Sequence, residues 1–566
     1  MGRLTGADLF VNCVKAEGVD TIFTVVGDQI LALVDAVAEA GIRIVDTRHE
    51  SSAVHAADAY ARVSGRPGMV WTTGGPGLAN SIAGLTVASV NESPVIHVAG
   101  SGAIKERGMM SFQEIPQLDM VRPVTKSALE IYDARRIPEV IGNSLRAAVG
   151  GRPGPVHISF PTDLQEQQIE ESDVAPYRPA MTRTQGKARG DASLIQAAVA
   201  ALRNAKRPAI ILGAAARYGL DPTVLREFAE TTRVPVFTTE SARGMLDDRH
   251  PYCFGYAERG LNDAARLYGK ADVVLIAGKR FDLQLGYARP PVIAADATVI
   301  QVEPDPNFIG RNRDVQIGIL ADIGGAFEQL LKEARGLLWR EQADWLAELR
   351  AVRKQQAEKL FALGNDEMPL HPMRVAKELV RYNDENTVIS IDGGDFIAWS
   401  RAALHARTPG SWLRLGNLGH LGCGLPNAIG AKVARPDARV IHLTGDGSIG
   451  FYFMEYDTAI RHNIPFVTVM GNDAQWGIDR GFQLAYYGRA VATDLRWVRY
   501  DQAVQAIGGY GELVESPADL GPAIDRAFAS GKPALVNVRT QWAQSPFAQG
   551  YVARHKAEHA ARGQGR

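Results

Sequence analysis

The sequence predicts an α/β protein of three consecutive domains, each built on a doubly wound parallel sheet. The chain has 566 residues, which is too long for a single hydrophobic core. Short apolar runs of strand length alternate with helical patterns along nearly the whole chain, as in parallel sheets with crossover helices. Two of these runs end in turns of glycine and aspartate, at residues 392–395 and 445–448, where open parallel sheets bind ligands.

The first domain is expected over residues 1–180. Its predicted strands are residues 21–26, 42–45, 68–71, 95–99 and 156–160. A polar stretch with proline and arginine, about residues 175–190, follows these strands and predicts a linker.

The alternation then restarts twice. The second domain, residues 190–335, has predicted strands at 209–212, 234–237, 273–277 and 299–302. A charged helical segment, 338–363, is expected as a surface connection. The third domain, residues 365–545, has predicted strands at 388–391, 440–443, 466–470 and 535–538. Residues from 541 onward are basic and irregular in pattern, and 546–566 are expected to form a C-terminal tail.

Composition excludes several classes of function. A hydrophobic content of 46% and a charged content of 22% are typical of globular proteins. A net charge of −1 predicts no binding to nucleic acid or to an anionic membrane surface. Cys13, Cys253 and Cys423 lie far apart without metal-ligand spacing, which fits a reducing cytoplasm. We find no signal-peptide pattern and no apolar run long enough to span a bilayer.

The most specific motif lies in residues 440–477. One apolar run ends in Gly445-Asp446-Gly447-Ser448, and the next ends in Asn472-Asp473, so that both carboxyl groups follow strands of one sheet. Mg²⁺ is usually held by one or two carboxylates with phosphate oxygens and water, so Asp446 and Asp473 could hold a magnesium diphosphate. For Gly-Asp-Gly alone, a turn that caps a helix is an equal alternative. The downstream Asn-Asp makes the pair more specific.

These residues resemble the cofactor motif of thiamine-diphosphate-dependent enzymes, in which GDG is followed after a helix and a strand by Asn-Asn. The resemblance implies that Asp446, Asp473 and the main-chain carbonyl of Gln475 hold Mg²⁺. Asp473 replaces the second Asn of the family, which keeps an oxygen ligand but adds a negative charge. The cofactor-binding residues implied around these ligands are Gly445, Gly447, Ser448, Trp476 and Gly477. The three predicted domains match the pyrimidine-binding, central and diphosphate-binding domains of the family.

The segment RHESSAVHAADAYAR carries the candidate catalytic acid, Glu50. In the family, a glutamate at this place hydrogen-bonds the cofactor's aminopyrimidine ring, and a carboxyl in an apolar pocket can hold a proton near neutral pH. The structural alternative is that Glu50 only complements the positive end of a helix. The following segment WTTGGPGLANSIAGL matches the family's first domain and favours the catalytic role.

Two further segments resemble cofactor-binding elements. In LGNLGHLGCGLPNAIGA, Leu421 is implied as the residue wedged between the two cofactor rings, and the Gly419 carbonyl as the acceptor for the amino group. A glycine-rich turn into a helix is the structural alternative. The loop 392–396, with Gly394, Asp395 and Phe396, resembles the loop that binds the diphosphate from the other side. Because the family shares each site between subunits, the resemblance implies at least a homodimer, and a homotetramer is common.

Acetolactate synthase is one candidate within the family, but three of its features are altered here. Thr162 stands where that enzyme has a lysine. Residues 280–284 read Arg-Phe-Asp-Leu-Gln in place of Arg-Phe-Asp-Asp-Arg, and 258–260 replace a His-Gly element associated with flavin. These changes weaken both a keto-acid site and an FAD site. The central domain either holds a nucleotide such as ADP or is empty.

The chain is more similar to the 2-hydroxyacyl-CoA lyases and oxalyl-CoA decarboxylases. The segment SFQEIPQLDMVRPVTK resembles the lyases, and Gln113 stands where the decarboxylase has a glutamate. IQVEPDPNFIGRN and TDLRWVRYD also resemble this branch. The implied activity is cleavage of a 2-hydroxyacyl-CoA to an aldehyde or ketone and formyl-CoA, which is reversible. The alternatives are an acetolactate-synthase-like carboligase or decarboxylase, an oxalyl-CoA decarboxylase, or a non-enzymatic subunit. The last predicts loss of Glu50 or of the metal ligands, which are all present.

Candidate groups for proton transfer are Gln113 and Asp28, although Asp28 in VVGDQ is equally well explained as a loop cap. Coenzyme A carries phosphate groups, so we expect basic residues near the entrance of the site. The tail supplies Arg554, His555, Lys556, Arg562 and Arg566. We therefore expect it to act as a lid, with a solvated terminus as the alternative. Candidates to line the acyl pocket, or simply to pack, are Trp476, Phe482, Tyr486 and Tyr487.

Overall fold

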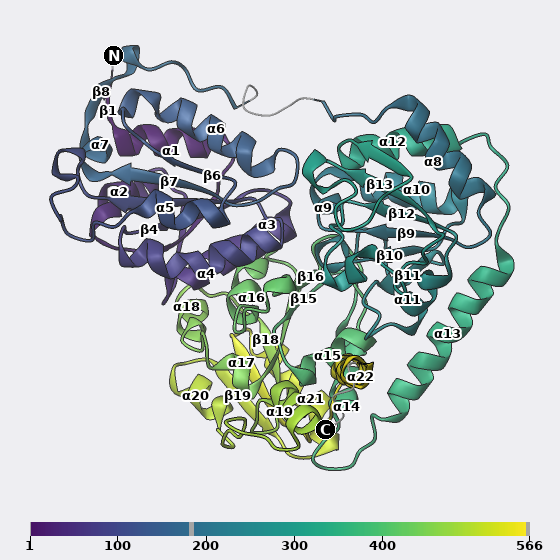
Figure 1. Cartoon of the computed structure of the whole chain (residues 1–566). Helices are drawn as coiled ribbons and strands as arrows, with labels where there is room; N and C mark the ends of the chain where they lie inside the picture. The colour runs from purple at the N-terminus through teal and green to yellow at the C-terminus, as the bar shows by residue number, and fades with distance from the viewer. Residues whose placement is uncertain (1, 180–185, 562–566) are drawn as a thin grey trace. The chain divides into compact units, whose positions relative to one another are not determined.

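The computed structural model describes residues 2–179 and 186–561 (Figure 1). Its contacts divide the chain into two compact units. Unit 1 comprises Met1–Gly186, Leu415–Pro436 and Asp457–His462, and unit 2 comprises Lys187–Arg414, Asp437–Tyr456 and Asn463–Arg566. Within these units lie three parallel six-stranded sheets flanked by helices, which confirms the predicted fold class.

Unit 1 contains a parallel sheet of strand order β3-β2-β4-β5-β7-β6. Its strands are β2 (Thr21–Val25), β3 (Arg43–Asp46), β4 (Gly68–Thr72), β5 (Val95–Ser101), β6 (Ser127–Glu130) and β7 (Val156–Pro161). Its helices are α1 (Gly6–Ala16), α2 (Leu31–Glu39), α3 (Glu50–Ser64), α4 (Pro76–Val90), α5 (Gln117–Val121), α6 (Ile137–Val149), α7 (Thr162–Glu166) and α16 (Gly424–Ala434). Helices α1 and α6 lie on one face of the sheet, and α3 and α4 lie on the other (Figure 1). A separate antiparallel pair joins β1 (Arg3–Thr5) to β8 (Gln168–Glu170).

Helix α3 is buried along almost its whole length because it packs between α4 and α16. Glycine makes this close packing possible. A Cβ atom on Gly430 would lie 1.9 Å from the Ala56 carbonyl oxygen, and one on Gly84 would lie 2.6 Å from Val54 Cβ. Glu50 is the first residue of this helix, so the packing of α3 against α4 and α16 fixes the position of its backbone.

The first sheet of unit 2 has the order β11-β10-β9-β12-β13-β14, again parallel. Its strands are β9 (Pro208–Leu212), β10 (Val236–Thr238), β11 (Cys253–Tyr256), β12 (Val273–Ala277), β13 (Thr298–Glu303) and β14 (Ile317–Leu320). Its helices are α8 (Ala192–Asn204), α9 (Ala216–Gly219), α10 (Pro222–Thr232), α11 (Asp263–Leu267), α12 (Ile323–Ala334) and α13 (Ala343–Ala362). Two apolar cores, one on each face of the sheet, include Phe228 and Trp345 respectively. Helix α13 confirms the predicted charged helix.

The second sheet of unit 2 has the order β16-β15-β17-β18-β20-β19. Its strands are β15 (Thr387–Ile391), β16 (Trp412–Arg414), β17 (Arg439–Gly445), β18 (Val467–Asn472), β19 (Tyr510–Val514) and β20 (Ala534–Arg539). The helices around it include α14 (Pro372–Leu379), α15 (Asp395–Ala403), α17 (Asp446–Ile449), α19 (Gly477–Tyr487), α20 (Tyr500–Ala506), α21 (Pro517–Ala529) and α22 (Pro546–Ala561). Helix α18 (Glu455–Arg461) is divided between the two units by its contacts.

All thirteen predicted strands have a counterpart in the three large sheets. Five described strands of these sheets were missed, β6, β11, β14, β16 and β19, as was the separate pair β1 and β8. Each missed strand lies at an edge of its sheet. Edge strands have one neighbour and are less completely buried, so their sequences need no continuous apolar run. The apolar pattern therefore identified the strands in the interior of each sheet.

The prediction of an irregular C-terminal tail is wrong for the described residues. Residues 546–561 form α22, which packs on α15 and α19. Aromatic contacts hold it there: the rings of Tyr486 and His555 stack with centroids 3.7 Å apart, and Phe482 lies 6.4 Å from Tyr551. Arg562 and Arg566 lie outside the described residues, as do residues 180–185 of the predicted linker.

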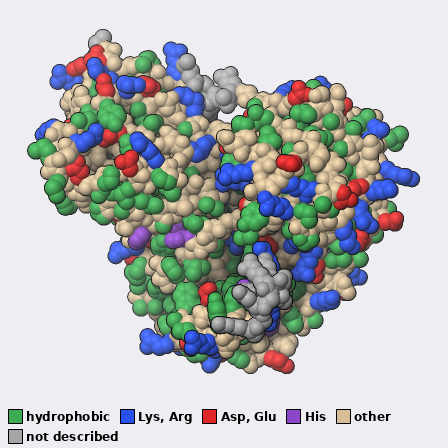
Figure 2. All heavy atoms as spheres, viewed as in Figure 1, with side chains coloured by type: hydrophobic (Ala, Val, Ile, Leu, Met, Phe, Trp, Pro, Cys, Tyr) green, Lys and Arg blue, Asp and Glu red, His purple; other side chains and the backbone are tan. Residues whose placement is uncertain are grey.

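The described helices include none with the length and apolar character needed to cross a bilayer. On the face drawn in Figure 2, Lys and Arg side chains are interspersed with Asp and Glu. Cys13, Cys253 and Cys423 are all buried free thiols.

Candidate cofactor and active site

Glu50 begins α3 at the point where β3 has ended. His49 precedes it as the N-cap residue and accepts a hydrogen bond at Nδ1 from the Ser51 main-chain N–H over 3.1 Å. The Glu50 side chain is half-buried, and its Oε2 accepts a hydrogen bond of 2.9 Å from Asn80 Nδ2 on α4. Gly77 lies beside the other oxygen, where a Cβ would be 3.6 Å from Oε1. The carboxylate is thus oriented from α4, with one oxygen left for another donor.

Thr73, in the turn after β4, lies close to the segments of all three predicted catalytic residues. Its hydroxyl donates to Gln113 Oε1 over 2.9 Å. A Cβ on Gly77, next to Glu50, would lie 2.8 Å from Thr73 Cγ2, and a Cβ on Gly27, next to Asp28, would lie 2.6 Å from Thr73 Cβ. Unit 1 therefore brings the segments of Glu50, Gln113 and Asp28 together around one buried threonine.

Gln113 has a backbone φ of +62°, in the left-handed region that non-glycine residues seldom adopt. The loop that holds it is tied to the sheet by Gln29, whose side chain donates to the Phe112 carbonyl over 2.9 Å and accepts from the Gly74 N–H over 3.0 Å. Gly75 packs against Gln113, where a Cβ would lie 2.7 Å from Gln113 Cβ. These contacts stabilise the unusual backbone conformation. Asp28 is exposed at the start of a short 3₁₀ turn.

A cavity of about 720 Å³ opens beside Gln113 within unit 1. Its lining is mostly polar or charged and includes Arg107, Arg122 and Gln117. The buried Gln117 side chain donates to the Gly100 carbonyl over 3.2 Å, while its Oε1 atom has no hydrogen-bond partner among the described residues. A volume of this size is within the range of small-molecule and cofactor sites.

Leu421 and Gly419 also belong to unit 1 by their contacts. Gly419 has a φ of +74° and is exposed, and Leu421 is half-buried immediately before α16. The ring of His420 between them lies 5.1 Å from that of the buried His55 on α3. The segment therefore places Gly419 and the apolar side chain of Leu421 near α3, the helix that begins with Glu50.

Asp446 and Asp473 lie in unit 2, at the ends of the neighbouring strands β17 and β18. Both side chains are largely buried and lie within hydrogen-bonding distance of each other. Burial raises the pKa of both groups, and the nearby Asp446 carboxyl raises the pKa of Asp473 further. Asp446 Oδ2 has no hydrogen-bond partner among the described residues. Asp446 is buried and Asp473 is half-buried, and carboxylate oxygens are ligands that Mg²⁺ prefers, so this pair fits Mg²⁺.

The residues after Asp473 form a tight turn at Ala474, which has a φ of +56°. Gln475 pairs with Asp494 in an isolated antiparallel bridge. The Trp476 ring lies against Gly447, where a Cβ would be 2.7 Å away. The main-chain N–H of Trp476 donates to the Thr493 carbonyl over 2.8 Å. Gly477 begins α19. No group of three or more His, Cys, Asp or Glu side chains suited to a metal occurs in the described ranges.

The turn after β15 faces the same end of this sheet, because β15 and β17 are neighbours. Gly394, with a φ of +113°, precedes α15, and Asp395 Oδ1 accepts from Ser545 Oγ over 2.5 Å. Ser448 Oγ donates to the Gly393 carbonyl over 3.2 Å, which joins the two glycine turns. Phe396 packs on Gly471, where a Cβ would lie 2.2 Å from the ring. Glycine N–H groups and helix N-termini in this position suit a diphosphate.

The chain matches three family models. The N-terminal TPP binding domain of thiamine pyrophosphate enzymes matches residues 4–120, the central domain matches 195–330, and the C-terminal TPP binding domain matches 392–538. The chain belongs to the thiamine pyrophosphate enzymes. Thiamine pyrophosphate is the same compound as thiamine diphosphate, so the predicted family is confirmed.

Known thiamine pyrophosphate enzymes similar to this chain have two different names. The acetolactate synthase large subunit IlvG of Mycobacterium tuberculosis is 35% identical over 540 residues, which cover 94% of this chain and 95% of the relative. 2-Hydroxyacyl-CoA lyase 2 of Bos taurus is 33% identical, over 90% of this chain and 85% of the relative. 2-Hydroxyacyl-CoA lyase of Arabidopsis thaliana is 31% identical, over 92% and 93%. Overall identity therefore does not separate the two activities.

In this thiamine pyrophosphate enzyme the sequence-predicted residues fall into two groups. Glu50, Gln113, Asp28, Gly419 and Leu421 lie in unit 1, and residues 394–396, 445–448 and 473–477 lie in unit 2. Sequence reasoning missed Thr73, Asn80 and Gln29, which orient the predicted residues. Thr73 and Asn80 lie inside the quoted WTTGGPGLANSIAGL segment, so that motif held a signal for them.

Proposed function

We propose that the protein is a thiamine-diphosphate- and Mg²⁺-dependent 2-hydroxyacyl-CoA lyase. It cleaves a 2-hydroxyacyl-CoA into an aldehyde or ketone and formyl-CoA, and the reverse condensation uses the same site. The observation that carries this proposal is Gln113, a neutral amide, held by Thr73 at the edge of a cavity that Arg107 and Arg122 line. A neutral donor suits a thioester carbonyl. Arg107 and Arg122 pair with the lining carboxylates Glu130 and Asp119, and the proposal assigns these two arginines to the phosphate groups of coenzyme A.

Bound thiamine diphosphate supplies a carbon nucleophile and stores the electron pair of the broken carbon–carbon bond. Glu50 holds a proton at the pyrimidine ring nitrogen, with Asn80 fixing its other oxygen. Leu421 would supply an apolar contact to the bound cofactor, and the Gly419 carbonyl would be the acceptor for its amino group. Asp446, Asp473 and the Gln475 carbonyl hold Mg²⁺ against the diphosphate, which the turn at Gly394, Asp395 and Phe396 closes from the other side.

Two residues are assigned to the substrate. Because Gln113 Oε1 already accepts from Thr73, its Nε2 donors are available for the thioester carbonyl oxygen. Asp28, which is exposed beside this segment, removes the proton of the 2-hydroxyl group. The aldehyde or ketone product contains the carbon that bore the hydroxyl group. The thioester carbon takes up a proton in its place and leaves as formyl-CoA.

The proposal also includes the assembly and α22. We assign each site to two subunits of a homodimer or homotetramer, with Glu50 from one subunit and the metal ligands from the other. Helix α22 acts as a lid over the bound acyl-CoA, with Arg554 and Lys556 supplying positive charge. Its aromatic contacts with α19 place it next to the segment that follows Asp473.

An acetolactate-synthase-type carboligase is the second candidate, and the 35% identity to such a synthase favours it. Against it, Thr162 replaces the lysine of that enzyme, and Gln284 donates to Glu240 over 2.5 Å where the synthase has an arginine. These replacements remove two positive charges that a keto-acid carboxylate would require.

The deciding experiment compares three substrates with one preparation of cofactor-loaded protein. We expect formyl-CoA and an aldehyde from 2-hydroxyacyl-CoAs, with no CO₂ release from pyruvate. CO₂ release with acetolactate formation from pyruvate would establish the second candidate. CO₂ and formyl-CoA from oxalyl-CoA at a higher kcat/KM than from any 2-hydroxyacyl-CoA would establish a decarboxylase.

A further inference from the structure

A second cavity lies within unit 2, between the first sheet of that unit, α13 and the C-terminal end of α15. Its volume is about 170 Å³, and its lining includes Arg243, Arg353, Arg401 and only one carboxylate, Asp248. A water molecule occupies about 30 Å³ in the liquid, so the space holds more than one small polar molecule. Neither the family models nor the proposed reaction assigns a role to this cavity.

Two of its arginines are buried with unused hydrogen-bond donors. Arg243 is 2% exposed and pairs through Nη2 with Asp248, but its Nε and Nη1 have no partner among the described residues. Arg401 is 3% exposed and donates through Nη2 to the Tyr256 hydroxyl over 2.7 Å, while its Nε has no partner there. Leaving a buried donor without an acceptor is costly, so these groups indicate an acceptor in the cavity.

The orientation of Arg243 is set by its neighbours. Its guanidinium carbon lies 3.8 Å from the centre of the Trp412 ring and 4.9 Å from that of Tyr256. Stacking of this kind uses the faces of the guanidinium plane and leaves the N–H groups at its edge to bind an acceptor.

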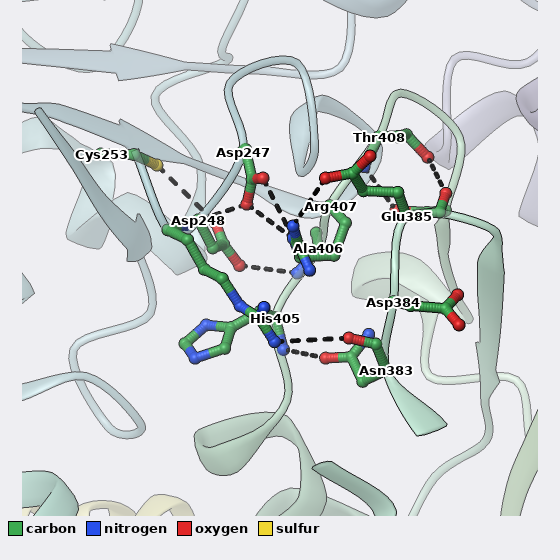
Figure 3. Close-up of polar contacts among 12 residues, drawn as sticks. Asp247, Asp248, Cys253, Asn383, Asp384, Glu385, His405, Ala406, Arg407 and Thr408 are labelled. Atoms are coloured by element: carbon green, nitrogen blue, oxygen red, sulfur yellow. Dashed lines mark hydrogen bonds and ion pairs between the residues drawn. The ribbon is translucent and has the colours of Figure 1, made fainter. Parts of the chain in front are cut away.

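Asp248 already accepts from three other donors. It accepts from Arg243, from the Ala406 N–H over 2.8 Å and from Cys253 Sγ over 3.7 Å (Figure 3). These contacts, drawn in Figure 3 beside His405, use both of its carboxylate oxygens.

The charge balance around the cavity is positive. The charged side chains are Arg243, Arg353, Arg401 and Arg414 against Asp248, Glu240 and Glu258, which is four positive and three negative groups. Glu240 is paired with Arg414 at 2.6 Å. Arg353 makes its hydrogen bonds to main-chain carbonyls, of Cys253 and Asp248, both at 2.8 Å. The net positive charge around the cavity therefore favours binding of a monovalent or divalent anion.

We propose that this cavity binds a small inorganic oxyanion, such as phosphate, through Arg243, Arg353 and Arg401. The volume of 170 Å³ is below the 300–1,000 Å³ typical of sites for larger ligands, which excludes a nucleotide or coenzyme A. Arg401 belongs to α15, whose first turn carries Asp395 and Phe396. The bound anion thus restrains the Arg401 side chain, and with it the helix that carries the proposed diphosphate-binding turn. This inference does not depend on the proposed lyase activity.

The test uses the full-length protein without cofactor or substrate, in a buffer free of phosphate. Isothermal titration calorimetry measures binding of inorganic phosphate at constant ionic strength, balanced with chloride. We expect saturable binding that Arg353→Met weakens at least tenfold. The matched control, Lys354→Met, removes the same charge from the next residue of α13, which is exposed, and leaves the affinity unchanged. No binding, or equal affinity in both variants and the unaltered protein, would overturn the proposal.

A second readout follows the effect on α15. Phosphate should slow amide hydrogen exchange of residues 395–403 in the unaltered protein and in Lys354→Met, but not in Arg353→Met. Should Arg353→Met fail to fold, crystals soaked in selenate give a direct result: anomalous density in the cavity supports the proposal, and density only elsewhere refutes it. Because neither measurement involves turnover, both outcomes are independent of whether the protein is a lyase.

Discussion

The Thr73 hydroxyl donates a hydrogen bond of 2.9 Å to Gln113 Oε1, across 40 residues of sequence. This bond joins the glycine-rich turn after β4 to a residue held at a φ of +62°. It decides which end of the Gln113 amide is available to a substrate, because an amide whose oxygen is occupied presents its N–H groups.

Replacing Thr73 with valine removes this donor at nearly constant volume. We expect kcat for a 2-hydroxyacyl-CoA to fall about five- to tenfold, since one hydrogen bond contributes about 1 kcal/mol. Steady-state kinetics measures this effect. Thr86→Val is the matched control, because the Thr86 hydroxyl bonds only the Ile82 carbonyl on its own helix. An equal loss in both variants would mean that Thr73 acts through stability alone.

Glu50→Gln keeps the size of the side chain and its contact with Asn80 but removes the ionisable proton site. We expect kcat to fall by about 10²–10⁴, the range for loss of a positioned acid or base. The affinity for Mg²⁺ should stay the same, since the proposed metal ligands lie in the other unit. Turnover within twofold of the unaltered enzyme would exclude the assigned role of Glu50.

Asp473→Asn restores the residue that the family motif has at this position. The change removes the repulsion between Asp473 and Asp446, so the metal-free protein should melt a few degrees higher. It also removes one negative charge from the site, so Mg²⁺ affinity should fall about tenfold. Thermal melting in EDTA and calorimetric titration with Mg²⁺ measure the two effects. Asp494→Asn, at an exposed ion pair with Arg480, should change neither.

His97 and His157 face each other in the core of unit 1, with their Nδ1 atoms 2.9 Å apart. Burial lowers the pKa of His97 from 6.5 to about 3 and lowers that of His157 well below 6.5. Both therefore stay uncharged in the folded protein, whereas the unfolded chain takes up protons below pH 6.5. Stability should fall by about 1.4 kcal/mol per histidine for each pH unit below that value.

Melting temperatures between pH 7 and pH 5 test this dependence. The double variant His97→Phe, His157→Phe should melt with a smaller change over this range. An unaltered slope in the double variant would assign the acid sensitivity to other groups.

Truncation after Gln549 removes most of α22, including Tyr551 and His555, which pack on Phe482 and Tyr486. If α22 is a lid, the KM for the acyl-CoA should rise about tenfold while binding of thiamine diphosphate persists. Truncation after Ala561 keeps the described helix and should not change KM. A KM unchanged by the longer truncation would refute the lid.

The sequence by itself determined the cofactor family and the fold class. Asp446, Asp473 and Glu50 each follow an apolar run directly, so their placement at strand ends could be predicted from neighbouring residues alone. The strands inside each sheet were visible for the same reason, since burial on both faces requires a continuous apolar run. Five of the six edge strands of these sheets, which lack that requirement, were not predicted, and β3 was.

Only the tertiary structure decided how separate segments meet. The hydrogen bond between Thr73 and Gln113 joins two segments that no local sequence pattern relates. The same is true of the cavity lined by Arg243, Arg353 and Arg401, which come from three separate parts of the chain. The packing of helix α22 also could not be predicted locally. Its sequence has no apolar stripe, and its aromatic side chains contact residues of α19. Local patterns reflect burial along one element, whereas contacts between distant side chains depend on how the elements pack.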